Sequence, residues 1–302
     1  MPTSVRTTDR ALPAAMTQTT ITEVLERSTE SLQRAGIFGA QVDAELLIGH
    51  VLGLSRGGVQ ARVATSSPLS VDDVITVSEL VERRAAREPL QHITGRAPFR
   101  SMELAVGPGV FVPRPETETV VQFAIDALRA VPGSPIGIDL GTGSGAIALA
   151  MATEVPHSRV WGVEVSPRAF IWTKQNFRES GATNATPIFT DLAIALPELD
   201  GTADVVISNP PYIPLGAIPR DPEVRLHDPE IALYGGPDGL DVVRQVSTTA
   251  LRLLHAGGTL VLEHGELQSA AITALLREDG WLAVASHRDL LGRDRATTAL
   301  RP

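Results

Sequence analysis

From residue 117 to the C-terminus the sequence alternates between helical and extended patterns, and no other feature limits the fold as strongly. Short apolar runs rich in β-branched residues are expected as strands at 136–140, 160–164, 186–189, 204–208 and 259–263. Helical spacing predicts helices at 117–130 and 240–254, two helices that begin near 147 and near 167, and a last helix that ends at about 277. Extended pieces follow at 282–287 and 296–301. This alternation predicts an α/β fold in which helices cover both faces of a parallel sheet.

The chain before residue 117 has a different pattern. Residues 20–88 show helical apolar spacing and predict a small bundle of four helices, the first opened by a capping box of Thr20 and Glu23. The other three are expected at 41–52, within 55–62 and at 70–87. Residues 89–116 contain short extended pieces between glycines and prolines, at 91–94, 103–106 and 110–112, and predict a β-hairpin linker to the domain at 117–302.

The composition excludes several kinds of site. The 302 residues include no cysteine, so a disulfide framework, a thiol nucleophile and a thiolate zinc site are excluded. The formal net charge of -9 argues against a long phosphate backbone as partner. Residues 1–19 lack the apolar stretch of a signal peptide and are expected to be a disordered leader, and no segment approaches the roughly 18 apolar residues of a membrane span. We therefore expect a cytoplasmic protein without a membrane partner.

A glycine-rich turn follows the first expected strand, in Asp139-Leu140-Gly141-Thr142-Gly143-Ser144-Gly145-Ala146. Alternate glycines let the backbone turn tightly and approach a ligand where a Cβ would collide, and the next helix N-terminus offers free N–H groups. The pattern favours a nucleotide-cofactor loop, with a plain strand-to-helix turn as the alternative. The spacing Gly141-x-Gly143-x-x-Ala146 also fits the dinucleotide fingerprint, so it leaves the identity of the cofactor open.

Two further strands end in candidate cofactor ligands. Glu164 ends the second strand, where a carboxylate is placed to accept hydrogen bonds from both ribose hydroxyls of a nucleotide. Asp191 and Leu192 follow the third strand, where they would meet an adenine amino group and an adenine face. A simple helix-capping role for Asp191 is the alternative.

The fourth strand runs directly into Asn209-Pro210-Pro211-Tyr212. Two prolines remove backbone donors and fix the main chain, so the turn can aim the Asn209 side-chain oxygen and the Pro210 carbonyl at one point. A planar –NH2 group would donate one hydrogen to each, while Tyr212 stacks on it. Two fixed acceptors favour the positive charge that grows on nitrogen during methyl transfer, and alignment with a methyl donor lowers the entropic barrier.

The glycine loop and the Asn-Pro-Pro-Tyr turn together resemble a class I methyltransferase that methylates nitrogen. More closely, the chain from Thr20 onward is similar to the release-factor glutamine methyltransferases (the HemK or PrmC family). Most particular is the run Phe111-Val112-Pro113-Arg114-Pro115-Glu116-Thr117-Glu118. Other shared segments are Asp43-Ala44-Glu45-Leu46-Leu47, Pro89-Leu90-Gln91-His92-Ile93-Thr94-Gly95, Ala232-Leu233, Asp238-Gly239-Leu240 and Glu263-His264-Gly265.

This resemblance implies a Rossmann-like sheet, an N-terminal bundle that docks substrate, and S-adenosylmethionine as cofactor, released as S-adenosylhomocysteine. The acceptor would be the glutamine of a Gly-Gly-Gln loop in a peptide-chain release factor, with no direct nucleic-acid substrate. The cofactor residues implied are Gly141, Thr142, Gly143, Ser144, Gly145, Glu164, Asp191, Leu192 and Asn209. The substrate-binding residues implied are Asn209, Pro210, Pro211, Tyr212, Arg114 and Glu116, of which Asn209, Pro210 and Tyr212 would be catalytic. A structural ion pair that ties the linker to the domain is the alternative for Arg114 and Glu116.

Three other functions are compatible with parts of the sequence. An adenine N6-methyltransferase shares the Asn209-Pro210-Pro211-Tyr212 turn, which we call the acceptor turn, but such an enzyme normally has a basic surface that binds nucleic acid. A dinucleotide-dependent oxidoreductase fits the glycine spacing but leaves the acceptor turn unused, and so does a binding module without catalysis. The proline-rich segment at 213–239 is long for a connection and is expected to close over the acceptor pocket, with an ordinary surface excursion as the alternative.

Overall fold

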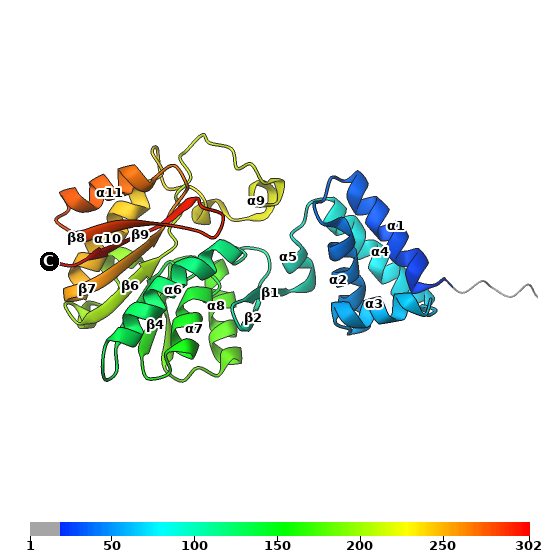
Figure 1. Ribbon diagram of the computed structural model, residues 1–302, viewed down its shortest axis with the longest axis horizontal. Coiled ribbons are helices and arrows are strands. Elements are labelled where there is room, and N and C mark those ends of the chain that lie inside the picture. Colours follow the sequence, from blue (N-terminus) through cyan, green and yellow to red (C-terminus); the bar gives the residue numbers. More distant parts are fainter. Residues whose placement is uncertain (1–18) are drawn as a thin grey trace, which may run out of the picture. The chain divides into compact units, whose positions relative to one another are not determined.

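The computed structural model describes residues 19–302, which divide into two compact units, one ending at Ala86 and one spanning Arg87–Pro302 (Figure 1). Apart from Thr19, the expected leader lies outside the described residues. Among the helices that are described, none combines the length and apolar character needed to cross a membrane.

The first unit is a bundle of four helices close to the expected ranges: α1 (Ile21–Arg34), α2 (Ala40–Leu52), α3 (Arg56–Ala64) and α4 (Val71–Ala85). The expected capping box is present, since the Thr20 hydroxyl accepts from the Glu23 N–H (3.3 Å) and the Glu23 carboxylate accepts from the Thr20 N–H (3.0 Å). Fully buried aliphatic side chains form the core of the unit: Ile21, Leu32, Leu47, Ile48, Val59 and Val77. An ion pair of 2.8 Å between Asp43 and Arg84 joins α2 to α4.

The linker is only partly the hairpin that the sequence predicts. Strands β1 (Arg96–Phe99) and β2 (Met102–Ala105) pair as an antiparallel hairpin, but residues 91–94 are helical, in α5 (Leu90–Thr94). Pro89 fixes the entry to this helix and Gly95, with φ 72°, ends it after five residues, too short a run to show helical periodicity. Residues 110–112 are not a strand; Val110 and Val112 are buried in a core cluster with Ala169, which lies in the same unit.

The second unit is built on a seven-stranded sheet with the order β5-β4-β3-β6-β7-β9-β8. Its strands are β3 (Ile136–Leu140), β4 (Arg159–Glu164), β5 (Ala185–Phe189), β6 (Ala203–Ser208), β7 (Leu254–Glu263), β8 (Leu282–Arg288) and β9 (Asp294–Leu300). The expectation of a parallel sheet is correct for β3 to β7 but wrong for β9, which runs antiparallel to both neighbours. Only five residues connect β8 to β9, and so short a connection permits only a hairpin.

Helices cover both faces of this sheet (Figure 1). Alternate residues of β6 point to opposite faces: Val205 and Ile207 pack in the core with α6 and α7, and Val206 packs in the core with α10 and α11. The helices are α6 (Pro115–Ala130), α7 (Ala146–Glu154), α8 (Pro167–Ser180), α9 (Pro222–His227), α10 (Asp241–Leu253) and α11 (Ser269–Glu278). Three short 3-10 helices are η1 (Leu192–Ile194), η2 (Pro197–Leu199) and η3 (Glu230–Ala232).

The register of the central strands brings the candidate loops to one edge. Leu140 is paired with Val163 of β4, and Asp139 with Ile207 of β6, so β3, β4 and β6 end side by side. The Ser208 hydroxyl donates to the Leu140 carbonyl at 2.6 Å, which joins the end of β6 to the start of the glycine loop. The segments after these strands therefore share one site.

Replacing Thr20 with Ala should destabilise the helical unit by about 1 kcal/mol, because the first turn of α1 loses its side-chain cap. Urea unfolding followed by circular dichroism measures this change. Ser78→Ala is the matched control, since it removes an exposed hydroxyl bonded only to the Val74 carbonyl within α4. Equal stability of the two variants would contradict a stabilising role for the cap.

Candidate active site

The glycine loop after β3 has the conformation that its sequence requires. Gly141, Gly143 and Gly145 have φ values of 77°, 57° and 89°, in the left-handed region that side chains avoid. The N–H groups of Gly141 and Thr142 both donate to the Val163 carbonyl, at 2.9 and 2.8 Å, so the loop is fixed to the end of β4. A Cβ on Gly145 would lie 2.8 Å from the Phe177 ring, so this glycine also permits close helix packing.

Glu164 lies beside this loop and is buried, with 7% of its surface exposed. Its carboxylate accepts from the Gly143 N–H (2.8 Å) and the Ser166 N–H (2.7 Å). Burial raises the pKa of Glu164, and these backbone donors partly lower it again. Each carboxylate oxygen retains a second lone pair, so Glu164 can hold the loop and still accept from a ligand.

One cavity of about 970 Å³ joins the loop, Glu164 and the acceptor turn. Every candidate site residue predicted from the sequence lines it except Gly145, whose role is conformational. Asp191 and Leu192 also lie on its wall, although the Asp191 carboxylate accepts from the Ala193 N–H (2.9 Å) and thus caps η1. The volume is at the upper end of the range for small-molecule pockets, which suits two ligands better than one.

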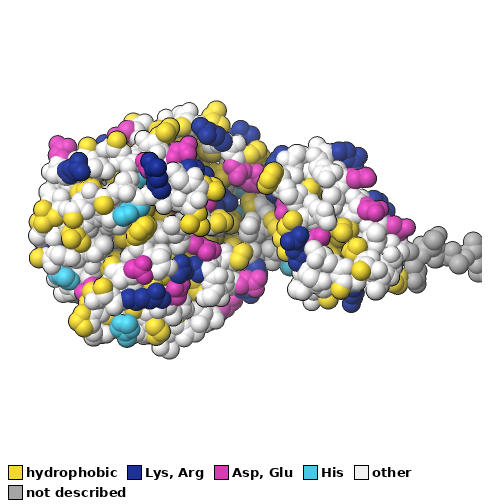
Figure 2. Space-filling view, viewed as in Figure 1, with side chains coloured by type: hydrophobic (Ala, Val, Ile, Leu, Met, Phe, Trp, Pro, Cys, Tyr) yellow, Lys and Arg dark blue, Asp and Glu magenta, His cyan; other side chains and the backbone are white. Residues whose placement is uncertain are grey.

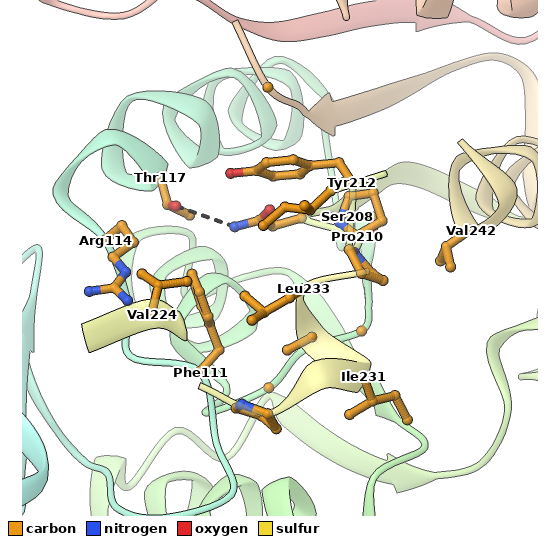
Figure 3. Close-up of a pocket in the computed structure, with 18 of the residues that line it drawn as sticks. Phe111, Arg114, Thr117, Ser208, Pro210, Tyr212, Val224, Ile231, Leu233 and Val242 are labelled. Carbon is orange, nitrogen blue, oxygen red and sulfur yellow. Dashed lines mark hydrogen bonds between the residues drawn. The ribbon is translucent and has the colours of Figure 1, made fainter. Parts of the chain in front are cut away.

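The acceptor turn is held by backbone and side-chain contacts (Figure 3). The Asn209 amide nitrogen lies 3.5 Å from the Thr117 hydroxyl, and the Tyr212 carbonyl accepts from the Gln268 amide at 2.8 Å. In the view of Figure 3 the Tyr212 ring lies on one side of the dashed line that starts at Thr117, and Phe111 and Leu233 lie on the other. Burial raises the pKa of Tyr212 to about 12, so its phenol remains neutral.

Arg114 has a partner that the sequence does not reveal. Its guanidinium forms a 2.7 Å ion pair with Asp228, whose side chain is fully buried, and lies 4.9 Å from the centre of the Phe111 ring. Burial raises the pKa of Asp228 to about 6, and Arg114 opposes that rise. Arg114 and Glu116 both line the cavity, and Arg114 also makes a structural ion pair, with Asp228.

The segment at 213–239 forms one wall of the cavity, and it contains α9 and η3. Its ends are tied by main-chain bonds: Ile213 N–H to the Leu233 carbonyl (2.8 Å) and Gly235 N–H to the Ile213 carbonyl (2.9 Å). A Cβ on Gly235 would lie 2.4 Å from the Pro211 carbonyl oxygen, so the segment approaches the acceptor turn as closely as a backbone allows.

Two buried acids near the site were not among the predicted functional residues. Asp139 accepts from the Thr142 hydroxyl and the Ala148 N–H, and its Oδ1 has no hydrogen-bond partner among the described residues. Glu263, at the end of β7, is 1% exposed and its Oε2 has no partner in the described part of the chain. The available signal was their position, since each acid interrupts or ends an apolar strand beside a candidate loop.

Comparison with known proteins identifies the family. The PrmC N-terminal domain matches residues 23–95 and the methyltransferase small domain matches residues 102–217. The release factor glutamine methyltransferase of Streptomyces coelicolor is 48% identical over 90% of this chain and 95% of its own length. The chain belongs to the release factor glutamine methyltransferase family. The Bifidobacterium longum member is 43% identical, over 91% of this chain and 97% of the relative.

Two other similarities concern different acceptors. A 4-amino-L-phenylalanine/4-methylamino-L-phenylalanine methyltransferase of Streptomyces pristinaespiralis is 38% identical over 93% of this chain and 95% of its own length. The hMettl16 catalytic domain, solved with the MAT2A 3′UTR hairpin 6, has a TM-score of 0.54 at 15% identity, covering 74% of this chain and 82% of that one. The latter supports the fold only. The expected class I methyltransferase fold and methyltransferase activity are confirmed, and the oxidoreductase alternative is wrong.

Asp139→Asn should weaken the dependence of stability on pH. Burial raises the pKa of Asp139 from 3.8 to about 7, so the folded protein holds this proton more tightly than the unfolded chain does. The resulting stabilisation is fully present below the unfolded pKa and is lost as pH rises through about 7.

Urea unfolding at several pH values between about 5 and 8 measures the effect as a smaller fall in the free energy of unfolding for Asp139→Asn than for the wild type. Asp126→Asn is the control, because the Asp126 side chain is 62% exposed and should leave the slope unchanged. An unchanged slope in Asp139→Asn would show that this carboxyl does not titrate in the range.

Proposed function

We propose that this protein transfers the methyl group of S-adenosylmethionine to the side-chain amide nitrogen of the glutamine in the Gly-Gly-Gln motif of peptide-chain release factors. The observation that carries the proposal is that the glycine loop and the Asn209-Pro210-Pro211-Tyr212 turn line the same cavity. Family membership supports the same acceptor, since relatives at 48% and 43% identity are release factor glutamine methyltransferases.

The residues around the loop fit S-adenosylmethionine. Gly141 and Gly143 have open space where a Cβ would stand, so ligand atoms can approach their backbone. Glu164 is placed to accept from ribose hydroxyls, and Asp191 and Leu192 line the wall assigned to the adenine. The bound cofactor supplies an electrophilic methyl group on a sulfonium; the protein supplies the geometry.

The acceptor turn would help the acceptor nitrogen to react. An amide nitrogen is a poor nucleophile because its lone pair is delocalised. The Asn209 side-chain oxygen and the Pro210 carbonyl would accept hydrogen bonds from the two N–H groups of the amide, and both bonds become more favourable as positive charge grows on the nitrogen. As the methyl group leaves the sulfonium and bonds to nitrogen, one of these hydrogens would be lost as a proton to water. Tyr212 would stack on the planar amide, and its neutral phenol adds no competing charge. Holding the nitrogen in line with the methyl group supplies the entropic part of catalysis.

Other residues of the chain would contact the release factor. We assign residues 20–88 to release-factor docking, because the match to the PrmC N-terminal domain covers most of this bundle. Arg114 and Glu116 on the cavity wall would contact the loop that carries the glutamine. On the face of the described residues that Figure 2 shows, Lys and Arg side chains are scattered among acidic ones, which disfavours an extended nucleic-acid surface.

A small arylamine is the second acceptor to test, because the Streptomyces pristinaespiralis relative methylates 4-amino-L-phenylalanine according to its name. Separate reactions with labelled S-adenosylmethionine should contain a release factor, nucleic acid or 4-amino-L-phenylalanine. We expect label in the release factor, with mass spectrometry locating the methyl on the Gly-Gly-Gln glutamine. Label confined to nucleic acid or to the arylamine would overturn the proposal.

Asn209→Ala should lower kcat by about 10²- to 10³-fold, because the nascent cation loses one of its two acceptors. Protection against thermal unfolding by S-adenosylhomocysteine should remain, since the glycine loop and Glu164 are unchanged. Asn184→Ala is the control: Asn184 donates to the Ala152 and Ser158 carbonyls away from the cavity, so its loss should reduce stability but not kcat. Comparable kcat values for Asn209→Ala and the wild type would remove Asn209 from the mechanism.

A free peptide containing Gly-Gly-Gln should be a much poorer substrate than the whole release factor, by roughly tenfold or more in kcat/KM, because it cannot use a separate docking unit. Steady-state kinetics with both acceptors at one cofactor concentration tests this. Equal kcat/KM for peptide and protein would remove the docking role from residues 20–88.

A further inference from the structure

The proposed function requires the Asn209 amide to face one way. Its oxygen must point to the acceptor nitrogen, whereas its NH2 group would repel a substrate donor. The Thr117 hydroxyl, near the start of α6, lies 3.5 Å from the Asn209 amide nitrogen. A hydroxyl both donates and accepts, so Thr117 by itself does not select an amide orientation.

Glu263 can select one of the two orientations of the Asn209 amide. It ends β7, beside the strand that leads into Asn209, since Leu262 is paired with Ser208 in the sheet. Its side chain is buried, and Thr117 and Asn209 lower the pKa of its carboxyl, which burial raises. An ionised carboxylate has no proton to donate, so it can be approached only by the NH2 end of Asn209 and by the hydrogen of the Thr117 hydroxyl. The Thr117 oxygen is then free to accept from the same NH2 group.

We propose that Glu263, together with Thr117, is a positioning residue that fixes the Asn209 amide with its oxygen toward the acceptor nitrogen. The inference rests on the proposed function, because it assigns these two residues a task in the same reaction. Neither residue needs to touch the substrate for this task. The Glu263 Oε2 atom, buried without a partner among the described residues, reflects a carboxylate placed for function at a cost in stability.

The groups that face Glu263 determine how its charge responds to pH. Burial raises its pKa, Arg295 on β9 lowers it and Glu116 on α6 raises it, with the result at about 7. The Tyr212 phenol, also near this carboxyl, stays neutral at these pH values. The neighbouring His264 ring is bonded to Thr297 and to the Gly265 carbonyl. A protonated Glu263 can donate as well as accept, so it no longer selects one amide orientation, and kcat should fall as pH decreases through about 7.

Glu263→Gln tests the proposal because glutamine has nearly the same volume but also carries a donor. We expect kcat for release-factor methylation to fall by about tenfold or more, with KM for S-adenosylmethionine and protection by S-adenosylhomocysteine unchanged. The acidic limb of the kcat–pH profile should disappear. Glu154→Gln is the matched control, because Glu154 is a partly buried glutamate of the same unit that pairs with Arg100 outside the cavity. It should keep both the wild-type kcat and the acidic limb.

The outcomes separate this inference from the proposed function. If the wild-type protein does not methylate a release factor, the proposed function fails before any variant is compared. If the wild type is active and Glu263→Gln has the wild-type kcat, the inference is overturned. It is also overturned if kcat falls but the acidic limb of the kcat–pH profile remains, because a purely structural role would give that result. Should Glu263→Gln fail to fold, Thr117→Val and Thr117→Ser decide: a lower kcat in Thr117→Val and a wild-type kcat in Thr117→Ser support the positioning role, and equal kcat values in the two variants contradict it.

Discussion

The structure depends on the parallel hydrogen-bond ladder that aligns β3 with β4 on one side and β6 on the other. Because these strands are in register, their carboxyl ends lie together, and a loop from one can bond to the end of the next. The Val163 carbonyl holds the glycine loop and the Leu140 carbonyl accepts from Ser208. The glycine loop and the Asn209-to-Tyr212 turn are therefore joined to one edge of the sheet, through main-chain bonds to the Val163 carbonyl and through the buried Ser208 hydroxyl.

The predicted fold is close to the structure where one pattern decides the conformation. The strand at 136–140 was predicted to the residue, because an apolar run ending in glycines has few alternatives. The errors have identifiable causes. The helix at Leu90–Thr94 is too short for periodicity, and its start and end depend on Pro89 and Gly95. The antiparallel direction of β9 follows from the short connection between β8 and β9. The alternation of helical and extended patterns does not indicate strand direction.

Local motifs predicted which residues line the cavity, whereas the contacts that hold those residues in place come from tertiary packing. Asn209 and Glu164 follow strands directly, and sequence position is enough to suggest their roles. The roles we assign to Asp228 and Glu263 depend on residues distant in the chain: Asp228 pairs with Arg114, 114 residues away, and Glu263 follows the residue that is paired with Ser208 in the neighbouring strand. A single sequence contains no distances between such residues, so their contacts had to be observed.

The two ends of the wall at 213–239 are joined to each other by main-chain bonds, between Ile213 and Leu233 and between Gly235 and Ile213, and an ion pair at Asp228 joins the wall to Arg114. Main-chain anchors are indifferent to the side chains of the residues between them. The shape of this wall is thus open to evolutionary change by simple substitution, while the reactive turn stays in place. Under the proposed function, substitutions in this wall would change the acceptor without altering Asn209 or Pro210.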